Sequence, residues 1–310
     1  MSQLDAVTGA FSYSGGAIAR ELLKRGRHVR TLTGHPDRAP AGTPIDCRPL
    51  DFSDPDGLRG SLTGVHTLYN TYWVRFAHGT VTHDVAVANS RTLFAAAVAA
   101  GVQRIVHVSI THPSPDSPDS YFRGKAAAEQ ALAESGVPGY AVARPAILFG
   151  SAGVLVNNVA WLLRRVPVFA IGGRGDYRLR PVHVDDLGAL CADLGARTDT
   201  VVLDAVGPES LTFRQFVDSI RAAVASRSLV IPVPGVMIPV LAGALNVALR
   251  DTLLTAGEYR SLAAGRADSA GPATGTTVFT QWVQANGSEL GRRYLNELEL
   301  HFRATRLVAG

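Results

Sequence analysis

Two side chains with complementary acid–base chemistry stand four residues apart near the middle of the chain, Tyr121 and Lys125. On a helix, residues with this spacing lie on one face, about one turn from each other. The positive charge of a lysine favours the ionised form of a neighbouring phenol, and a tyrosine held in this way can give or take a proton. We therefore predict that Tyr121 is a general acid–base and that Lys125 is its electrostatic partner.

A serine is the third candidate for chemistry. Ser109 ends residues 105–109, an apolar run that predicts a strand, and its hydroxyl could orient a substrate carbonyl or hydroxyl. Only about a dozen residues separate it from Tyr121, and residues 112–118 between them are rich in proline and therefore rigid. This loop either brings Tyr121 to the site by a short path or leaves it misplaced, and the sequence leaves both alternatives open.

A glycine-rich turn follows the first predicted strand, residues 4–7, and precedes a predicted helix over residues 15–25. Such a turn lets the backbone approach a pyrophosphate, and the helix N-terminus supplies free N–H groups and the positive end of its dipole. Ser12 takes the place where a middle glycine is usual, but the strand–turn–helix context favours dinucleotide binding over a purely structural turn. The residues predicted to contact the dinucleotide here are Gly9, Phe11, Ser12, Tyr13, Ser14 and Gly15.

The end of the second predicted strand, residues 28–32, distinguishes the two nicotinamide dinucleotides. An acidic residue there would bind the adenosine ribose hydroxyls of NAD(H), whereas basic or small polar residues leave room for the 2′-phosphate of NADP(H). Thr33 follows the strand, and His35 and Arg38 are near, so the sequence favours NADP(H). Asp37 keeps NAD(H) as the alternative.

Further cofactor contacts are predicted along the same chain. Asp51 and Phe52 are expected to bracket the adenine, with a solvent-exposed turn as the alternative. Lys125 would hold the nicotinamide ribose as well as the phenol. Pro145 and Ile147 follow a predicted strand and would pack near the nicotinamide ring.

Aromatic residues follow the strand predicted over residues 65–70. Thr71 and Tyr72 stand where backbone and side chains are expected to face the cofactor. Tyr72 and Trp73 would wall a substrate pocket, and a plain core role for both rings is an equal alternative.

Short apolar strands alternate with longer helical patterns over the first half of the chain, with helices predicted over residues 83–100 and 125–135 and a strand over 140–143. This alternation is typical of an α/β fold, a doubly wound parallel Rossmann sheet. Beyond about residue 150 the pattern becomes irregular. We predict a dinucleotide-binding Rossmann domain over residues 1–150, and a smaller substrate or cap region over 151–310 that interleaves with the Rossmann core.

Three segments of the second half carry their own expectations. Residues 229–249 hold no charge, but three prolines interrupt the first half, so we expect a buried or cleft-covering segment rather than a membrane span. Residues 265–275 are rich in small residues and predict a surface loop. Residues 288–303 have helical periodicity and are predicted to dock on the body of the protein.

Composition excludes several classes of protein. The net charge of +4 is spread without blocks of like charge, so no nucleic-acid partner is expected. Two distant cysteines, Cys47 and Cys191, argue against a disulfide framework, and the isolated histidines argue against a metal site. The first residues are neither basic nor strongly apolar, so we expect no signal peptide and a cytoplasmic protein. No GxSxG, HExxH or Walker motif supports a hydrolase or an NTPase.

Seven short motifs, taken in their order and spacing, resemble the extended or atypical branch of the short-chain dehydrogenase/reductase (SDR) superfamily. The resemblance covers most of residues 4–220 and is closest to epimerase/dehydratase-like proteins, NmrA-like proteins and the nucleotide-binding accessory subunit of respiratory complex I. The motifs are the glycine turn Thr8-Gly9 to Gly15, Leu50-Asp51-Phe52, Asn89, Val106-His107-Val108-Ser109, Tyr121-Phe122-Arg123-Gly124-Lys125, Arg144-Pro145 and Val182-His183-Val184-Asp185-Asp186.

The resemblance implies an NAD(P)(H)-dependent oxidoreductase that acts on a small carbonyl or hydroxyl compound. Two departures bear on catalysis: the Ser109–Tyr121 spacing is about half that of typical extended members, and Ile110 stands where their active serine or threonine often lies, with Thr111 a further candidate. An NAD-dependent sugar-nucleotide epimerase or dehydratase, and a non-catalytic NADP(H)-binding redox sensor or accessory protein, are the alternatives. The substrate is not specified by the sequence, and a homodimer is an open alternative for the quaternary structure.

Overall fold

We describe the protein from a computed structural model that covers residues 3–36, 39–77 and 79–301. The chain folds into two compact units, each made of two stretches of sequence. The first unit contains Met1–Pro145 and Val184–Ala205, and the second contains Ala146–His183 and Val206–Gly310. The chain therefore crosses between the units three times.

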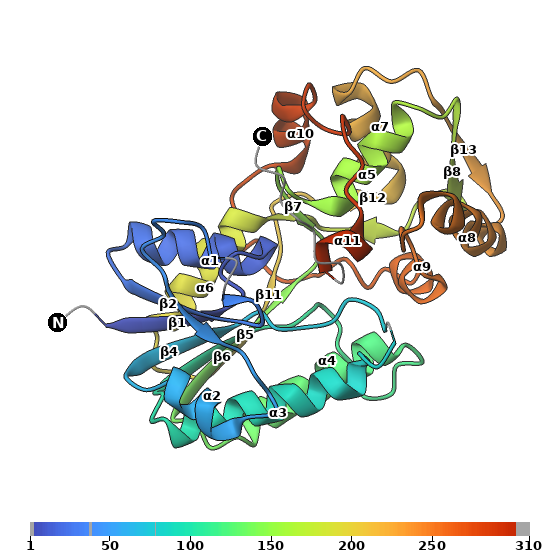
Figure 1. Ribbon diagram of the computed structural model, residues 1–310. Coiled ribbons are helices and arrows are strands. Elements are labelled where there is room, and N and C mark those ends of the chain that lie inside the picture. The colour runs from blue at the N-terminus through green and yellow to red at the C-terminus, as the bar shows by residue number, and fades with distance from the viewer. Residues whose placement is uncertain (1–2, 37–38, 78, 302–310) are drawn as a thin grey trace. The chain divides into compact units, whose positions relative to one another are not determined.

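The first unit is built on a parallel sheet of seven strands, which confirms the predicted α/β Rossmann fold (Figure 1). The strand order is β11-β6-β5-β4-β1-β2-β3, so the direction of winding reverses between β1 and β4. In such sheets, ligands bind beyond the carboxyl ends of the strands at this reversal. The strands are β1 (Leu4–Thr8), β2 (His28–Thr33), β3 (Asp46–Pro49), β4 (Val65–Asn70), β5 (Arg104–Val108), β6 (Gly139–Pro145) and β11 (Val201–Ala205).

Helices cover both faces of this sheet (Figure 1). On one face α1 (Tyr13–Lys24) packs against α6 (Val184–Gly195); on the other, α3 (His83–Ala99) lies between α2 (Pro55–Ser61) and α4 (Ser120–Ala133). Gly188 allows the close approach of α6, because a Cβ atom there would lie 2.8 Å from the backbone carbonyl carbon of Ala17. A buried cluster lies on the α2–α4 side and includes Leu32, Leu58, Leu62, Leu68, Leu93, Phe94, Ile105 and Leu132.

Helix α4 begins five residues before the predicted helix over 125–135. Asp119 starts it, because its carboxylate accepts a hydrogen bond of 2.9 Å from the backbone N–H of Tyr121. Tyr121 and Lys125 are therefore both helical and lie about one turn apart, as their spacing requires.

The second unit combines short strand pairs with helices around its own core. The strand pairs are β7 (Leu148–Phe149) with β10 (Val182–His183), β8 (Val168–Gly172) with β13 (Leu229–Val233), and β9 (Arg178–Leu179) with β12 (Leu211–Thr212). The helices are α5 (Val154–Leu163), α7 (Phe213–Ala223), α8 (Ile238–Leu249), α9 (Ala256–Ala263), α10 (Phe279–Asn286) and α11 (Glu297–His301). Phe216 and Phe279 stack in this core, and Phe149 meets Phe279 edge-on.

The expectation for residues 229–249 was a buried or cleft-covering segment, and its first alternative, burial, is wrong for much of the segment. Strand β13 exposes Leu229, and the turn and helix that follow expose Val236, Val240 and Val247, with 72–82% of each of these three side chains accessible. The reason is that α8 rests on its unit through few positions, Ile238 and Ala242 being the buried ones. Among the described helices, none is both long enough and apolar enough to cross a membrane.

The predicted helix over residues 288–303 is also wrong in its described part. Residues 287–290 form turns, and a helix forms only at α11. Gly291 has a φ of +71°, which a helix does not allow. A Cβ there would lie 2.4 Å from the backbone nitrogen of Trp161, so the backbone packs closely against α5 at this point. Residues 265–275 form a loop, as predicted, whose carbonyl groups at Ser269 and Gly271 accept hydrogen bonds from Arg180.

Candidate dinucleotide and catalytic site

The glycine turn joins β1 to α1 at the point where the winding of the sheet reverses. Gly9 has a φ of +67°, which favours glycine, and its N–H donates to the carbonyl of Leu32 at 2.9 Å. A Cβ atom on Gly15 would lie only 2.2 Å from the carbonyl oxygen of Gly9. The turn therefore requires glycine at both positions, and its backbone stands beside the end of β2.

The N-terminus of α1 is available to an anion. The first intrahelical hydrogen bond runs from Gly16 N–H to the carbonyl of Ser12, so the N–H groups of Tyr13, Ser14 and Gly15 lie ahead of the helical ladder. Within the described chain, the side chain of Ser12 makes no capping hydrogen bond to these groups. Free N–H groups and the helix dipole together fit a pyrophosphate, so this turn suits a dinucleotide despite the serine.

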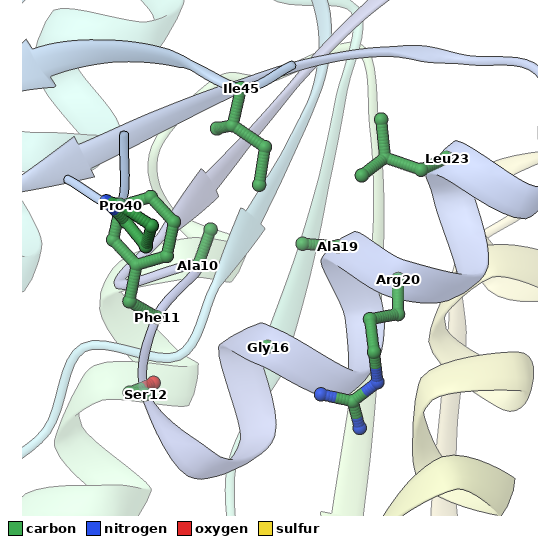
Figure 2. Close-up of a pocket in the computed structure, with 9 residues that line it drawn as sticks. All are labelled: Ala10, Phe11, Ser12, Gly16, Ala19, Arg20, Leu23, Pro40 and Ile45. Carbon is green, nitrogen blue, oxygen red and sulfur yellow. The ribbon is translucent and has the colours of Figure 1, made fainter. Parts of the chain in front are cut away.

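A cavity of about 380 Å³ adjoins the turn (Figure 2). Residues of α1 line one side, and the connection between β2 and β3 lines the other. Among the residues that line the cavity, Arg20 carries a charge. Its guanidinium pairs with Asp185 at 2.7 Å, and both side chains are mostly exposed. No motif predicted this cavity, because residues 39–45 have no regular structure. The lining residues are Ala10, Phe11, Ser12, Gly16, Ala19, Arg20, Leu23, Pro40 and Ile45.

The residues predicted for the adenosine end lie on neighbouring strands. The carbonyl of Thr33 accepts a hydrogen bond from Leu50 N–H at 2.8 Å, which places the ends of β2 and β3 side by side. His35 is exposed, and its N–H donates to the Thr33 hydroxyl at 3.2 Å. Asp51 is exposed and is engaged by the N–H and hydroxyl of Ser53, which lower the pKa of its carboxyl. Arg38 lies outside the described residues.

A hydrogen-bonded hub connects β1 to the residues after β4. The hydroxyl of Thr8 accepts from the N–H groups of Thr71 and Tyr72, at 2.7 and 3.0 Å, and donates to the Asn70 side chain at 3.2 Å. The Asn89 amide donates to the Tyr72 hydroxyl at 2.8 Å. The main chain at residues 70–72 is thus fixed beside the glycine turn.

Phe52 and Tyr72 come from different strand ends and meet at the same place. Their ring centroids are 4.7 Å apart with the ring planes tilted by 51°. Phe52 was predicted to contact the adenine, and Tyr72 was predicted to face the cofactor after β4. The structure therefore brings both positions to one edge of the sheet.

The predicted catalytic lysine is buried at the end of β5. Lys125 exposes only 3% of its surface, and its ammonium group donates to the carbonyl of Val108 at 3.0 Å. Burial lowers the pKa of Lys125 to about 7. Ser109, the next residue along, is also buried, and in the described part of the chain its hydroxyl has no hydrogen-bond partner. Lys125 and Ser109 therefore meet at the carboxyl end of one strand.

Tyr121 packs against two other rings, those of Trp73 and His83. Its ring is edge-on to Trp73, with centroids 6.0 Å apart, and edge-on to His83, at 5.6 Å. Trp73 also carries the Lys125 ammonium over its ring at 4.5 Å from the centroid. Tyr121, Lys125 and Trp73 thus form one cluster.

Two residues predicted near the nicotinamide lie in different units. Pro145 ends β6 in the first unit, and its carbonyl accepts a hydrogen bond from Thr111 N–H at 3.2 Å. Ile147 belongs to the second unit, where its carbonyl accepts from Val182 N–H at 2.9 Å and its side chain packs on that unit's core. A nicotinamide contact from Ile147 stays a prediction.

Sequence reasoning did not single out His107 as a site residue, although it lies directly beneath the site. It is fully buried in β5, and its Nδ1 atom is 3.0 Å from the Asn70 side-chain nitrogen. Burial, aided by the charge of Lys125, lowers the pKa of His107 to about 3, so the ring is neutral at physiological pH and accepts from Asn70 through Nδ1. The sequence signal that could have indicated this residue is a histidine within an otherwise apolar strand.

The parallel sheet and the glycine turn define a dinucleotide-binding protein of the Rossmann type. Residues 9–156 match the NAD(P)H-binding family. This match covers a little under half of the chain, and together with the relatives below it confirms the predicted resemblance to the atypical SDR branch. The predicted cofactor class, NAD(P)(H), is confirmed with it.

Three known proteins illustrate the likeness. A mitochondrial NADH dehydrogenase [ubiquinone] 1 alpha subcomplex subunit 9 from Dictyostelium discoideum is 32% identical over 135 residues, which cover 43% of this chain and 37% of that protein. The chain thus spans little more than a third of that relative. Triphenylmethane reductase from Citrobacter sp. superimposes with a TM-score of 0.76 at 18% identity, covering 94% of this chain and all of that one. The NADPH complex of the quinone oxidoreductase QOR2 from Escherichia coli gives 0.73 at 22% identity, covering 91% and 99%.

Proposed function

We propose that the protein is an NADP(H)-dependent oxidoreductase that transfers hydride to or from a small carbonyl or hydroxyl compound, with Tyr121 and Lys125 as its acid–base pair. The observation that carries the proposal is the position of Lys125. Its ammonium group is buried at the carboxyl end of β5, beside Ser109 and in one aromatic cluster with Tyr121. A buried cation without a paired carboxylate is costly, and active sites are where such groups concentrate.

Each of these residues has a separate role in the proposal. The bound cofactor supplies or accepts the hydride. Lys125 holds the ribose hydroxyls and stabilises the phenolate form of Tyr121. During reduction the neutral phenol of Tyr121 gives its proton to the substrate oxygen and becomes the phenolate, and during oxidation the phenolate takes the proton back. Ser109 donates to the same substrate oxygen from its buried hydroxyl, which has no partner among the described residues. The rigid loop over residues 112–118 is compatible with these roles, because α4 still places Lys125 within 3.0 Å of Val108.

The end of β2 supports NADP(H) over NAD(H). Thr33 and His35 carry no negative charge there, and Asp51, which follows the neighbouring strand β3, is engaged by Ser53. A 2′-phosphate would therefore meet no carboxylate from the described residues that directly follow β2, 33–36. The named complexes of two structural neighbours, with NADP(H) in the Citrobacter reductase and NADPH in the E. coli quinone oxidoreductase, agree with this choice.

We expect tighter binding of NADPH and NADP⁺ than of NADH and NAD⁺. The four nucleotides would be titrated into the purified protein at one fixed salt concentration, with binding followed by nicotinamide fluorescence or calorimetry. A preference of about tenfold or more for the phosphorylated pair is expected, because a charge-assisted contact contributes roughly 1.5–3 kcal/mol. Preference for a tightly retained NAD(H) would instead favour the epimerase or dehydratase alternative.

The affinity for NADPH is expected to fall as the pH rises through about 7. Burial lowers the pKa of Lys125 to about 7, so the ammonium charge that attracts the nucleotide is present below this pH and is lost above it. A decrease of about tenfold between acidic and basic limits is expected for one charge-assisted hydrogen bond. Lys125→Met should bind weakly with a flatter profile, and an unchanged inflection in that variant would contradict the role of Lys125.

A further inference from the structure

We propose that Trp73 is a positioning residue for Lys125: its ring holds the ammonium group at the carboxyl end of β5. This inference rests on the cofactor role proposed for Lys125. It assigns to Trp73 a task that differs from both expectations for this residue, the wall of a substrate pocket and a plain core side chain. Trp73 acts through the lysine and fixes where its charge lies.

The first observation is the environment of the Lys125 ammonium. Its nitrogen lies 4.5 Å from the centre of the Trp73 ring and 3.0 Å from the Val108 carbonyl oxygen. In the described chain no carboxylate pairs with it, because the nearby Glu129 is bonded to Arg144 at 3.0 Å. The aromatic face and one carbonyl are thus the groups in direct contact with the buried ammonium, while Glu129 favours its charge without pairing with it. Tryptophan offers the most favourable ring for this contact.

The second observation is that the Trp73 ring is itself held in place. His83 stacks on it in parallel, with centroids 6.0 Å apart and planes within 4°, and the Nδ1 atom of His83 lies 2.8 Å from the Ser120 hydroxyl. Tyr121 meets the ring edge-on. Helices α3 and α4 therefore both fix the plane over which the ammonium sits.

The third observation is the space that α4 leaves for the ring. Gly124 lies next to Lys125, and a Cβ atom there would approach the Cη2 atom of Trp73 to 2.9 Å, closer than side chains pack. Glycine inside a helix is ordinarily destabilising relative to alanine. At this position the absence of a side chain leaves room for the Trp73 ring, so Gly124 allows the ring to lie beside Lys125.

Without the ring, the flexible four-carbon side chain of Lys125 would lose its contact on that side. The ammonium could then leave the end of β5 and adopt other rotamers. The loss would concern the position of the charge and would not require unfolding. A test must therefore report where the lysine lies, independently of turnover.

Lysine composition makes that measurement direct. Of the 30 lysine and arginine residues only two are lysines, and the other, Lys24, exposes 80% of its side chain. Protein labelled with ¹³C at the lysine ε-carbon should therefore give two resonances. We expect the ε-protons of Lys125 to be shifted upfield of those of Lys24 by the ring current of Trp73. The shift should vanish in Trp73→Leu and persist in reduced form in Trp73→Phe.

The matched control is Trp161, whose ring carries Arg165 at 4.6 Å and lies in the second unit. Trp161→Leu removes an equivalent ring and should leave both lysine resonances in place. Gly124→Ala is the second variant, because it displaces the Trp73 ring without deleting it and should reduce the upfield shift while the helix is retained. An upfield shift that survives Trp73→Leu, or that is absent from the wild-type protein, overturns the proposal.

Adding NADPH separates this inference from the proposed function. Saturation should move the Lys125 resonance and leave that of Lys24 in place, and a Lys125 resonance unmoved by bound NADPH would contradict the cofactor role alone. With 9,10-phenanthrenequinone as the probe substrate, kcat should fall by roughly tenfold in Trp73→Leu and less in Trp73→Phe, as expected for a misplaced catalytic group. If Lys125→Met abolishes turnover while Trp73→Leu retains it fully, the lysine is needed and the tryptophan does not position it.

Discussion

Replacement of Gly15 by alanine should lower the affinity for NADPH by about 100-fold or more, since both the turn and its N–H groups would be displaced. The added Cβ atom would lie 2.2 Å from the carbonyl oxygen and 2.8 Å from the carbonyl carbon of Gly9. These are backbone atoms and cannot rotate away. Gly9 must also keep its positive φ, so the turn has no second conformation of similar shape.

The control for this change is Gly60→Ala in α2, where no atom lies within 4 Å of the added Cβ. That variant should bind NADPH as the wild type does and should keep or slightly raise the melting temperature, because alanine favours the helix. Circular dichroism would show that Gly15→Ala is folded before its affinity is measured by nicotinamide fluorescence. A folded Gly15→Ala protein with wild-type affinity would contradict the assignment of the turn to the dinucleotide.

Tyr121→Phe should lower kcat by about 10²- to 10⁴-fold, the usual contribution of a general acid or base. Affinity for NADPH should change little, because phenylalanine keeps the ring that meets Trp73 and His83 edge-on. Turnover would be followed as NADPH oxidation with 9,10-phenanthrenequinone and with a panel of small ketones and aldehydes.

Tyr140→Phe provides the matched control, since Tyr140 lies in β6 against the core cluster of the first unit and outside the proposed site. It removes the same hydroxyl group and should leave turnover unchanged. Equal turnover in Tyr121→Phe and the wild type would remove the catalytic assignment. Absence of turnover in the wild type, combined with tight NADPH binding, would favour the non-catalytic alternative that the short spacing between Ser109 and Tyr121 suggests.

The sheet and the glycine turn could be predicted from the sequence because both depend on local pattern. Apolar strands alternate with amphipathic helices, and Gly9 and Gly15 mark a turn between them, so chain order alone gives the strand ends that face the cofactor. The start of α4 was misplaced because the helix was taken from periodicity, whereas Asp119 initiates it through a capping hydrogen bond.

The aromatic cluster could not be predicted in the same way. Trp73 meets His83 and Lys125 from segments 10 and 52 residues away in the chain, across a connection without regular structure. No periodicity specifies which face of such a ring meets which side chain. The exposure of α8 could not be predicted either. Hydropathy shows that Val240 and Val247 are apolar, but whether other residues cover them depends on the tertiary structure, and in the described chain they are exposed.

The interleaving of the two units has a consequence for how the chain folds. The outer strand β11 and the helix α6 that packs on α1 both come from Val184–Ala205, after a long excursion into the second unit. The segment at residues 9–156 therefore lacks β11 and α6, and during synthesis the edge of β6 that pairs with β11 stays unpaired until that strand has left the ribosome. Such long-range closure slows folding and leaves the nascent edge exposed to wrong pairing. A protein shortened at the end of its family match would keep every glycine of the phosphate turn and still lack the strand that closes the sheet.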